Sequence, residues 1–251
     1  MHPDWLAPDW DAPGIGAVMT TRRGGFSEPP FDSMNLRDGL GDDPQCVQRN
    51  QTLFASSIGA APVFLRQVHG VKVVRLSAAD AAPDAPVHEA DASVTTEPGI
   101  ACTAQVADCL PVLFAAPGGV AAAHAGWRGL SEGVLEATVA ALCQATRCQP
   151  GQIQAWLGAG IGPNRFEVGA DVLRAFGASE HRVDTTRFRP HAPDKWLANL
   201  PRLARDRLQA RGVRAITGGR WCTAEDASRF FSFRRDGVTG RMVAAVWLDG
   251  R

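Results

Sequence analysis

Two histidines and one cysteine have the residue types and the setting that metal chemistry needs. His69 and His124 each follow an apolar, strand-like run and precede a glycine turn, in the segments LRQVHG and AAAHAG. Cys109 lies between them in VADCLPVLF, at the start of another apolar run. Two imidazoles and one thiolate make a three-ligand zinc set that leaves the fourth tetrahedral position open, as catalytic zinc sites do. His69, Cys109 and His124 are therefore the predicted metal ligands and catalytic residues.

The wide separation of these three residues along the chain leaves other interpretations open. The histidines can instead be strand-end residues bonded to backbone groups, with Cys109 as a core residue. Cys109 and His124 can also form a nucleophile pair, with Asp108 or another acid orienting the imidazole ring. A bound zinc ion would lower the pKa of its water to about 7 and supply hydroxide at neutral pH. Metal content therefore separates the two chemical interpretations.

Arginine recurs beside glycine and aromatic residues. Arg22 lies in TTRRGGFS, Arg66 in FLRQVHG and Arg128 in HAGWRG. A guanidinium group presents a planar fork to two oxygens of a phosphate or a carboxylate. Arg128 comes four residues after His124, which makes it the foremost candidate to hold an anionic substrate near a metal ion. The neighbouring Trp127 is expected to fill the core.

Bulk composition restricts the class of protein. The chain has 251 residues, 45% of them hydrophobic and 21% charged, which predicts one large globular domain over 1–251. Its 26 basic and 26 acidic side chains balance, which argues against a general nucleic-acid binder. No stretch approaches the run of about 18 apolar residues that spans a membrane, and the segment MHPDWLAPDWDAPG lacks the features of a signal peptide. Six irregularly spaced cysteines then predict reduced thiols in the cytoplasm.

Strand and helix patterns alternate along the chain. Apolar, β-branched runs predict strands within 63–76, 91–96, 100–116, 119–126, 153–162, 213–219 and 241–248. Helical spacing predicts helices over 131–146, with Ser131 as N-cap, over 171–176, and over 194–212, with Pro201 as a kink or a restart. Segments 77–91 and 181–195 are predicted surface loops. Because several strands are almost wholly apolar, we predict an α/β fold, a layered sandwich with mixed β-sheets inside and helices outside.

Seven sequence blocks together resemble one known family. They are TTRRGGFS…SMNL, RQVHG, ADCLPVLF, HAGWRG, GAGIGPNRFEVG, WCT and FFSFRRDGVTGR, and they extend from about residue 17 to 248. In this order they are similar to the bacterial laccase-domain family. Its members have been called polyphenol oxidases, peptidoglycan editing factors, and purine nucleoside phosphorylases with adenosine deaminase activity. The resemblance implies the layered fold and a metal bound by His69, Cys109 and His124.

The resemblance also implies an activity, which the residues help to select. A multicopper oxidase needs a blue-copper centre and a separate cluster with several more imidazoles, and six histidines cannot supply both. A zinc site that generates hydroxide suits hydrolytic loss of ammonia from a purine. We therefore expect a zinc-dependent purine nucleoside phosphorylase, acting on adenosine, inosine or methylthioadenosine, with adenosine deaminase activity. Arg22, Asn35, Arg66 and Arg128 are expected to contact substrate or phosphate. Asp108 is expected either to transfer a proton or to cap a turn.

Three alternatives remain open. The chain can be a hydrolase or amidase of cell-wall precursors with Cys109 as nucleophile, or a polyphenol oxidase if copper replaces zinc. It can also be a non-catalytic protein with a structural zinc, which requires a fourth ligand such as Cys102. The expected partners are a purine nucleoside and phosphate, without nucleic acid or membrane, and the expected state is a cytoplasmic monomer.

Overall fold

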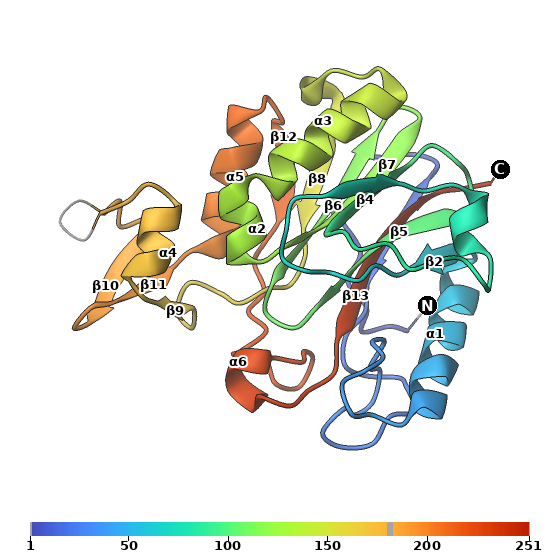
Figure 1. Ribbon diagram of the computed structural model, residues 1–251, viewed down its shortest axis with the longest axis horizontal. Helices are drawn as coiled ribbons and strands as arrows, with labels where there is room; N and C mark the ends of the chain where they lie inside the picture. The colour runs from blue at the N-terminus through green and yellow to red at the C-terminus, as the bar shows by residue number, and fades with distance from the viewer. Residues whose placement is uncertain (1, 180–182, 251) are drawn as a thin grey trace.

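The larger of the two main sheets carries most of the strands predicted from apolar runs. A computed structural model describes residues 2–179 and 183–250 (Figure 1). Six strands pair in the order β12, β8, β6, β7, β4, β3, with both parallel and antiparallel neighbours. Their bounds are Ala215–Gly218 (β12), Gln154–Leu157 (β8), Leu110–Ala116 (β6), Gly119–Ala125 (β7), Ala92–Thr95 (β4) and Val73–Arg75 (β3).

A second, four-stranded sheet packs against the first. Its order is β1, β13, β5, β2, with bounds Ile15–Met19, Met242–Leu248, Ile100–Val106 and Ala61–Val63. β13 pairs antiparallel with both β1 and β5, so that a late segment of the chain lies in the middle of the sheet. Side chains of both sheets, among them Leu113, Val120 and Val246, form one buried cluster between them.

Helices cover the outer faces of both sheets. α3 (Val134–Thr146) and α5 (Leu200–Ala210) pack on the outer face of the six-stranded sheet, where Phe114 and Leu135 lie in one buried cluster. α1 (Pro44–Ile58) covers the four-stranded sheet through residues such as Phe54. The result is a helix–sheet–sheet–helix sandwich, which confirms the predicted α/β fold with mixed sheets inside (Figure 1).

Smaller elements complete the structure. A three-stranded sheet of β10 (Phe188–Ala192), β11 (Lys195–Ala198) and β9 (Glu167–Val168) forms an extension at the left of Figure 1, together with α4 (Ala170–Ala175). The remaining short helices are α2 (Trp127–Glu132), α6 (Phe233–Asp236) and the 3₁₀ turns η1 (Ala78–Ala81) and η2 (Pro150–Gln152). None of the helices in the described segments is long and apolar enough to cross a membrane.

The predicted helix 131–146 begins later than expected. Gly133, with a φ of 106°, ends α2 and starts α3, so Ser131 lies inside α2 and is not an N-cap. Its hydroxyl donates to the carbonyl oxygen of Arg128 instead. A glycine adopts this left-handed conformation without the steric cost that other residues incur. The chain therefore makes a sharp corner directly after the HAGWRG segment.

The prediction of a helix over 194–212 was wrong for the first third of that segment. Trp196 and Leu197 belong to β11, where they are buried between β10 and β9. Asn199 caps α5 by accepting a hydrogen bond from the N–H of Arg202, and Pro201 occupies the first turn, where no kink results. Part of the predicted loop 181–195 is likewise strand β10, and 180–182 lie outside the described residues. Tertiary strand pairing overrides helical spacing here.

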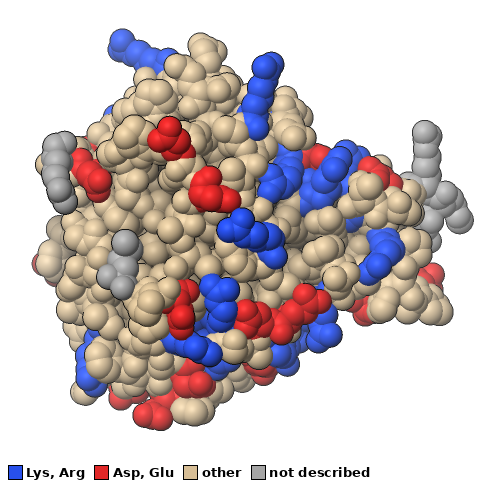
Figure 2. Space-filling model, turned by 180° about the vertical axis from the view of Figure 1, so that it is seen from behind, with Lys and Arg blue, Asp and Glu red and all other residues tan. Residues whose placement is uncertain are grey.

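Charges on the surface are mixed in sign. On the face drawn in Figure 2, basic and acidic side chains are interspersed, most densely along the lower edge. This distribution matches the formal net charge of zero.

Candidate metal centre

The three predicted metal ligands, far apart in the sequence, lie together in space. His69 comes from the loop between β2 and β3, Cys109 from the turn between β5 and β6, and His124 from the end of β7. Their donor atoms all lie within 4.8 Å of one another, and Cys109 Sγ is 3.8 Å from His69 Nε2. The rings of the two histidines meet edge to face, with centroids 4.8 Å apart. The fold thus assembles one cluster from three separate elements.

Strand register explains why Cys109 and His124 meet. β6 and β7 form an antiparallel pair in which Pro111 faces His124, so the turn before β6 lies beside the end of β7. Side chains alternate along β7: Ala123 and Ala125 face the helices, whereas Val120 and Ala122 face the second sheet. His124 therefore points into the space between the two sheets, where Cys109 also packs.

The carboxylate of Asp91 holds two of the three ligand segments. Asp91 is 1% exposed and its Oδ1 accepts a hydrogen bond of 2.8 Å from His124 Nδ1. The same carboxylate accepts from the backbone N–H groups of Val68, His69 and Gly70, at 2.8–3.1 Å. Because Nδ1 of His124 is occupied in this way, its Nε2 is left to face a metal ion. A carboxylate behind a histidine ligand commonly fixes the ring in this manner.

The backbone at His69 adopts a conformation that this carboxylate stabilises. His69 has a φ of 64°, in the left-handed region that few residues other than glycine occupy. Three successive N–H groups in such a turn form a concave anion site, and Asp91 fills it. Burial alone would raise the pKa of the Asp91 carboxyl, but the hydrogen bonds from His124 and from the backbone outweigh burial and lower it. Asp91 is therefore a buried anion at the base of the cluster.

Cys109 and His124 also stabilise each other as charged groups. Burial alone would raise the pKa of the Cys109 thiol, but the positive charge of His124 and hydrogen bonds from both histidines lower it to about 6. Burial likewise opposes protonation of His124, but the thiolate and the hydrogen bond with Asp91 raise its pKa to about 9. A metal ion needs a thiolate and a neutral imidazole, so its binding displaces the proton of His124.

Two glycines of the HAGWRG segment let α2 approach the cluster. A Cβ atom at Gly126 would lie 2.8 Å from His69 Cδ2 and 3.1 Å from Cys109 Sγ. A Cβ atom at Gly129 would lie 2.7 Å from the carbonyl oxygen of Gly70. The distances of 2.8 Å and 2.7 Å are shorter than real Cβ contacts, and 3.1 Å is tighter than most of them. Close approach, and not a left-handed backbone, is therefore the reason for glycine at these two positions.

Asp108 connects the Cys109 turn to the C-terminal part of the chain. Its carboxylate accepts from the hydroxyl of Thr223 at 2.5 Å and from the backbone N–H of Arg234 at 2.6 Å. Asp108 itself has a φ of 90°. The structure thus places it next to the cluster, with both carboxylate oxygens bonded within the protein.

The predicted substrate contacts lie in different surroundings. Arg22 donates to the carbonyl and the carboxylate of Asp32 and to the carbonyl of Ala227. Asn35 is fully buried and all of its amide hydrogen-bonding positions are used within the protein. Arg66 is exposed and pairs with Glu89. The roles of Arg22, Asn35 and Arg66 in substrate binding stay predictions.

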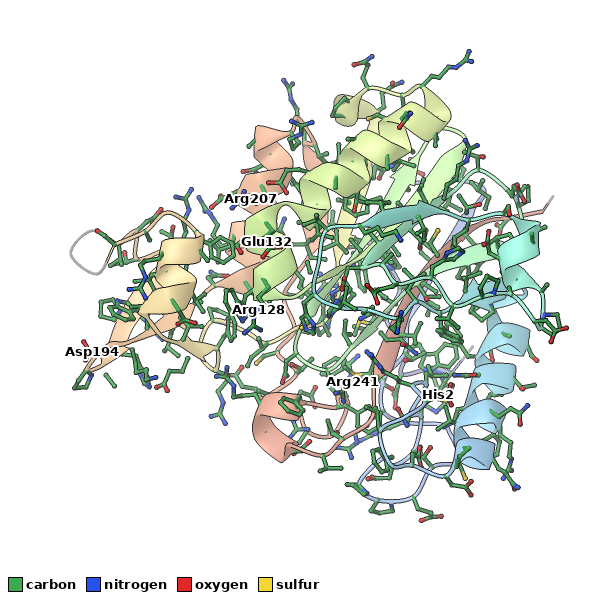
Figure 3. All side chains as sticks on the ribbon, in the orientation of Figure 1. His2, Arg128, Glu132, Asp194, Arg207 and Arg241 are labelled. Atoms are coloured by element: carbon green, nitrogen blue, oxygen red, sulfur yellow. The ribbon has the colours of Figure 1, made fainter. Side chains whose placement is uncertain are left out.

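Arg128 is the predicted arginine that remains free to bind a ligand. It projects from α2, and its guanidinium lies over the ring of Trp127, 4.4 Å from the centroid (Figure 3). No carboxylate among the described residues forms an ion pair with it. Trp127 is half-buried, so it both packs against the core and supports this arginine.

Sequence reasoning missed Asp91 and Arg241. It assigned Asp91 to the end of a surface loop, 77–91, but the side chain is buried beneath both histidines. Arg241, which directly precedes β13, is close enough to Cys109 and Asp108 for their charges to interact with its own. Asp91 directly precedes the buried strand β4, but its local sequence does not show that its own side chain is buried.

The donor set fits a metal ion. Tetrahedral zinc holds nitrogen at about 2.0–2.1 Å and sulfur at about 2.3 Å, which requires only a small contraction of the observed cluster. Cys102 does not join it: its buried thiol points to the carbonyl of Val120, and burial raises its pKa to about 12. Three protein ligands would leave one position of a tetrahedral metal ion unfilled, as in catalytic zinc sites, and His69 is the exposed member of the set.

We expect Asp91→Asn to weaken zinc binding by about 10–100-fold, because His124 and the His69 loop lose their anionic acceptor. Competition with a chromophoric chelator measures the affinity. Asp80→Asn is the matched control, since Asp80 also pairs with a histidine, His88 at 2.6 Å, but away from the cluster. Equal zinc affinity in the two variants would contradict the role assigned to Asp91.

We expect Gly126→Ala to weaken zinc binding while the chain stays folded. The backbone of Gly126 has a φ of −67°, which alanine adopts freely, so only the contact of the new methyl group with His69 and Cys109 matters. Gly151→Ala is the control, because its nearest neighbour would be 3.9 Å away. Zinc titration and thermal unfolding of the metal-free proteins distinguish a local effect from a global one. Unchanged affinity in Gly126→Ala would count against the close packing described above.

Known proteins share this architecture and sequence. The profile of a family described as multi-copper polyphenol oxidoreductase laccase matches residues 16–249. A protein named purine nucleoside phosphorylase PA4543, from Pseudomonas aeruginosa, is 48% identical over 250 residues, covering 98% of each chain. Purine nucleoside phosphorylase YfiH of Escherichia coli is 46% identical, covering 97% of this chain and 98% of its own. The crystal structure of Neisseria meningitidis NMB0706 has a TM-score of 0.90 and 42% identity, covering 98% of this chain and all of that one.

The predicted resemblance is therefore confirmed along almost the whole chain. Similarity at this level covers the blocks that contain His69, Cys109 and His124. The chain belongs to the laccase-like family described as multi-copper polyphenol oxidoreductase laccase.

Proposed function

We propose that the chain is a zinc-dependent purine nucleoside phosphorylase that also deaminates adenosine. The observation that carries this proposal is the His69–Cys109–His124 cluster, three donors with an open side, in a chain whose relatives are named purine nucleoside phosphorylases. Donor chemistry favours zinc, and copper is the alternative that the same ligands accept. When bound, zinc supplies Lewis acidity and a hydroxide nucleophile at neutral pH.

The donor set argues against multicopper oxidase chemistry despite the description of the family. Such an oxidase needs a second cluster built from several further imidazoles. Within 2–179 and 183–250, the only group of three or more suitable ligands is His69, Cys109 and His124. His88 and His191 pair with acidic residues elsewhere, namely Asp80 and Glu167. A single mononuclear site suits hydrolysis or group transfer.

In the proposed phosphorolysis, a phosphate oxygen forms a bond to C1′ of the ribose as the bond from C1′ to the purine nitrogen breaks. The base leaves with the electron pair and takes up a proton. Asp91 keeps His124 oriented. Arg128 projects from α2, where its guanidinium can attract an anionic group of the substrate. Asp108, beside Cys109, remains the proposed proton-transfer residue. The products are ribose 1-phosphate and the free base.

We also propose a monomer in the cytoplasm, with a purine nucleoside and phosphate as its partners. The six cysteines are all free thiols, which suits a reducing compartment. The balanced charge of the chain supports a small-molecule substrate over a nucleic acid.

The test uses protein whose zinc and copper contents have been measured. Incubation with adenosine should yield adenine and ribose 1-phosphate only when phosphate is present, and inosine with or without phosphate, as separated by chromatography. His124→Ala should abolish both reactions, whereas His88→Ala, which removes a histidine paired with Asp80 outside the cluster, should retain them. Absence of nucleoside turnover by fully zinc-loaded protein would reject the proposal.

A thiol hydrolase acting on cell-wall precursors is the second candidate, because the lowered pKa of Cys109 also suits a nucleophile. We expect chelation to abolish activity and zinc to restore it. A thiol hydrolase would instead survive chelation and be inactivated by alkylation of Cys109. That result, with precursor peptides cleaved, would favour the second candidate.

A further inference from the structure

One buried side chain, Asn35, holds together the backbone segments of two arginines that the proposed chemistry has not used. Asn35 Oδ1 accepts from the backbone N–H groups of Arg37, at 3.2 Å, and of Arg241, at 2.9 Å. Its amide nitrogen donates to the carbonyl of Arg37 and to the carboxylate of Asp42. The backbone N–H of Leu36 also donates to the carbonyl of Arg241. Segments more than 200 residues apart are thus locked together at this point.

Strand register brings this pair to the metal cluster. Met242, the first residue of β13, faces Val106 in β5, so Arg241 lies beside the turn that leads to Asp108 and Cys109 (Figure 3). Burial and the charge of Arg37 lower the pKa of Arg241, whereas Cys109 and Asp108 act in the opposite direction. Arg241 therefore lies near both Arg37 and the turn that contains Cys109.

Neither guanidinium has an acidic partner bonded to it among the described residues. Arg241 Nη1 donates to the carbonyls of Thr239 and Gly240, and its Nε and Nη2 find no acceptor in the described part of the chain. Within the same residues, the side chain of Arg37 forms neither a hydrogen bond nor an ion pair, and it lines a groove of about 580 Å³. The carbonyls of Thr239 and Gly240, the ring of Phe233 and the charges of Cys109 and Asp108 offset part of the charge of Arg241. An anion bound between Arg241 and Arg37 would offset the remaining repulsion between the two guanidinium groups. An oxyanion could accept hydrogen bonds from the N–H groups that have no acceptor within the described residues.

We propose that Arg241 and Arg37 form the binding site for inorganic phosphate, with Asn35 as the positioning residue that aligns them. The identity of the anion as a co-substrate rests on the function proposed above. Phosphate bound there is adjacent to the metal ligands, where it can meet C1′ of a nucleoside. Arg241 provides the inner, desolvated contact, and Arg37 the outer one at the groove.

Calorimetric titration of inorganic phosphate into zinc-loaded protein, without nucleoside, tests the site directly. We expect Arg241→Gln to raise the Kd for phosphate by about tenfold or more, as loss of a charge-assisted hydrogen bond predicts. Arg37→Gln should raise it less, because Arg37 lines the groove, where water screens its charge. Arg75→Gln is the matched control, since Arg75 lies on β3 and its guanidinium donates to the hydroxyl of Thr96. Phosphate affinity unchanged in both Arg241→Gln and Arg37→Gln would overturn the proposal.

Two further measurements distinguish loss of the anion site from loss of the fold. Arg241→Lys keeps the charge and should recover part of the phosphate affinity, whereas a variant weakened only by misfolding would show a lowered thermal midpoint. Arg37→Gln breaks no hydrogen bond with the described residues, so its effect does not depend on the fold. In steady state, both glutamine variants should raise the KM for phosphate more than the KM for adenosine. An equal rise in the KM for phosphate and the KM for adenosine would overturn the assignment to phosphate.

The same measurements, repeated with AMP, show whether the site binds inorganic phosphate or the phosphate group of a nucleotide. If the arginines instead bind the 5′-phosphate of a nucleotide, AMP will bind more tightly than phosphate and only AMP binding will weaken in the variants; this result would overturn the proposal. If zinc-loaded protein binds phosphate through Arg241 but converts no nucleoside, the proposed function fails and the anion site stands. If nucleosides react while Arg241→Gln binds phosphate normally, the function stands and this site fails.

Discussion

The buried carboxylate of Asp91 is the interaction on which the candidate metal centre depends. Removing a carboxylate from water costs several kcal/mol unless hydrogen bonds replace the water. Here four donors do so: the ring of His124 and three successive N–H groups around His69. One side chain therefore fixes the tautomer of one ligand and the backbone conformation of another. The cluster is therefore preorganised, because the negative charge of the Asp91 carboxylate already lies beside it.

The position of the cluster follows from the packing of the two sheets. Strand alternation points His124 into the space between the sheets, and the β6–β7 register brings Cys109 to the same end of that space. Two glycines then allow α2 to close over the His69 loop. A strand thus holds His124, the turn directly before β6 holds Cys109, and a loop anchored by Asp91 supplies His69. Such a combination keeps the ligands aligned and leaves one side open to a substrate.

Some of this arrangement was predictable from the sequence. The apolar runs located the long strands, and a histidine or cysteine at the boundary of such a run is conspicuous, so His69, Cys109 and His124 could be proposed as a set. Asp91 could not, because in a segment rich in alanine, proline and aspartate nothing local distinguishes a buried acid from an exposed one. Likewise Trp196 has helical spacing to Leu200, but pairing with β9 and β10 places it in a strand. Long-range contacts determine both the burial of Asp91 and the strand conformation of Trp196, and a local sequence pattern does not show such contacts.

The central place of β13 in the four-stranded sheet constrains how the protein is made. Residues 242–248 must insert between β1 and β5, which are synthesised long before them. The metal ligands leave the ribosome early, yet the sheet that covers one side of their cluster cannot close until the chain has been made as far as Leu248. Pairings of this kind have a high contact order and form slowly. A nascent chain thus carries exposed thiols and imidazoles before the fold can restrict which metal ion reaches them.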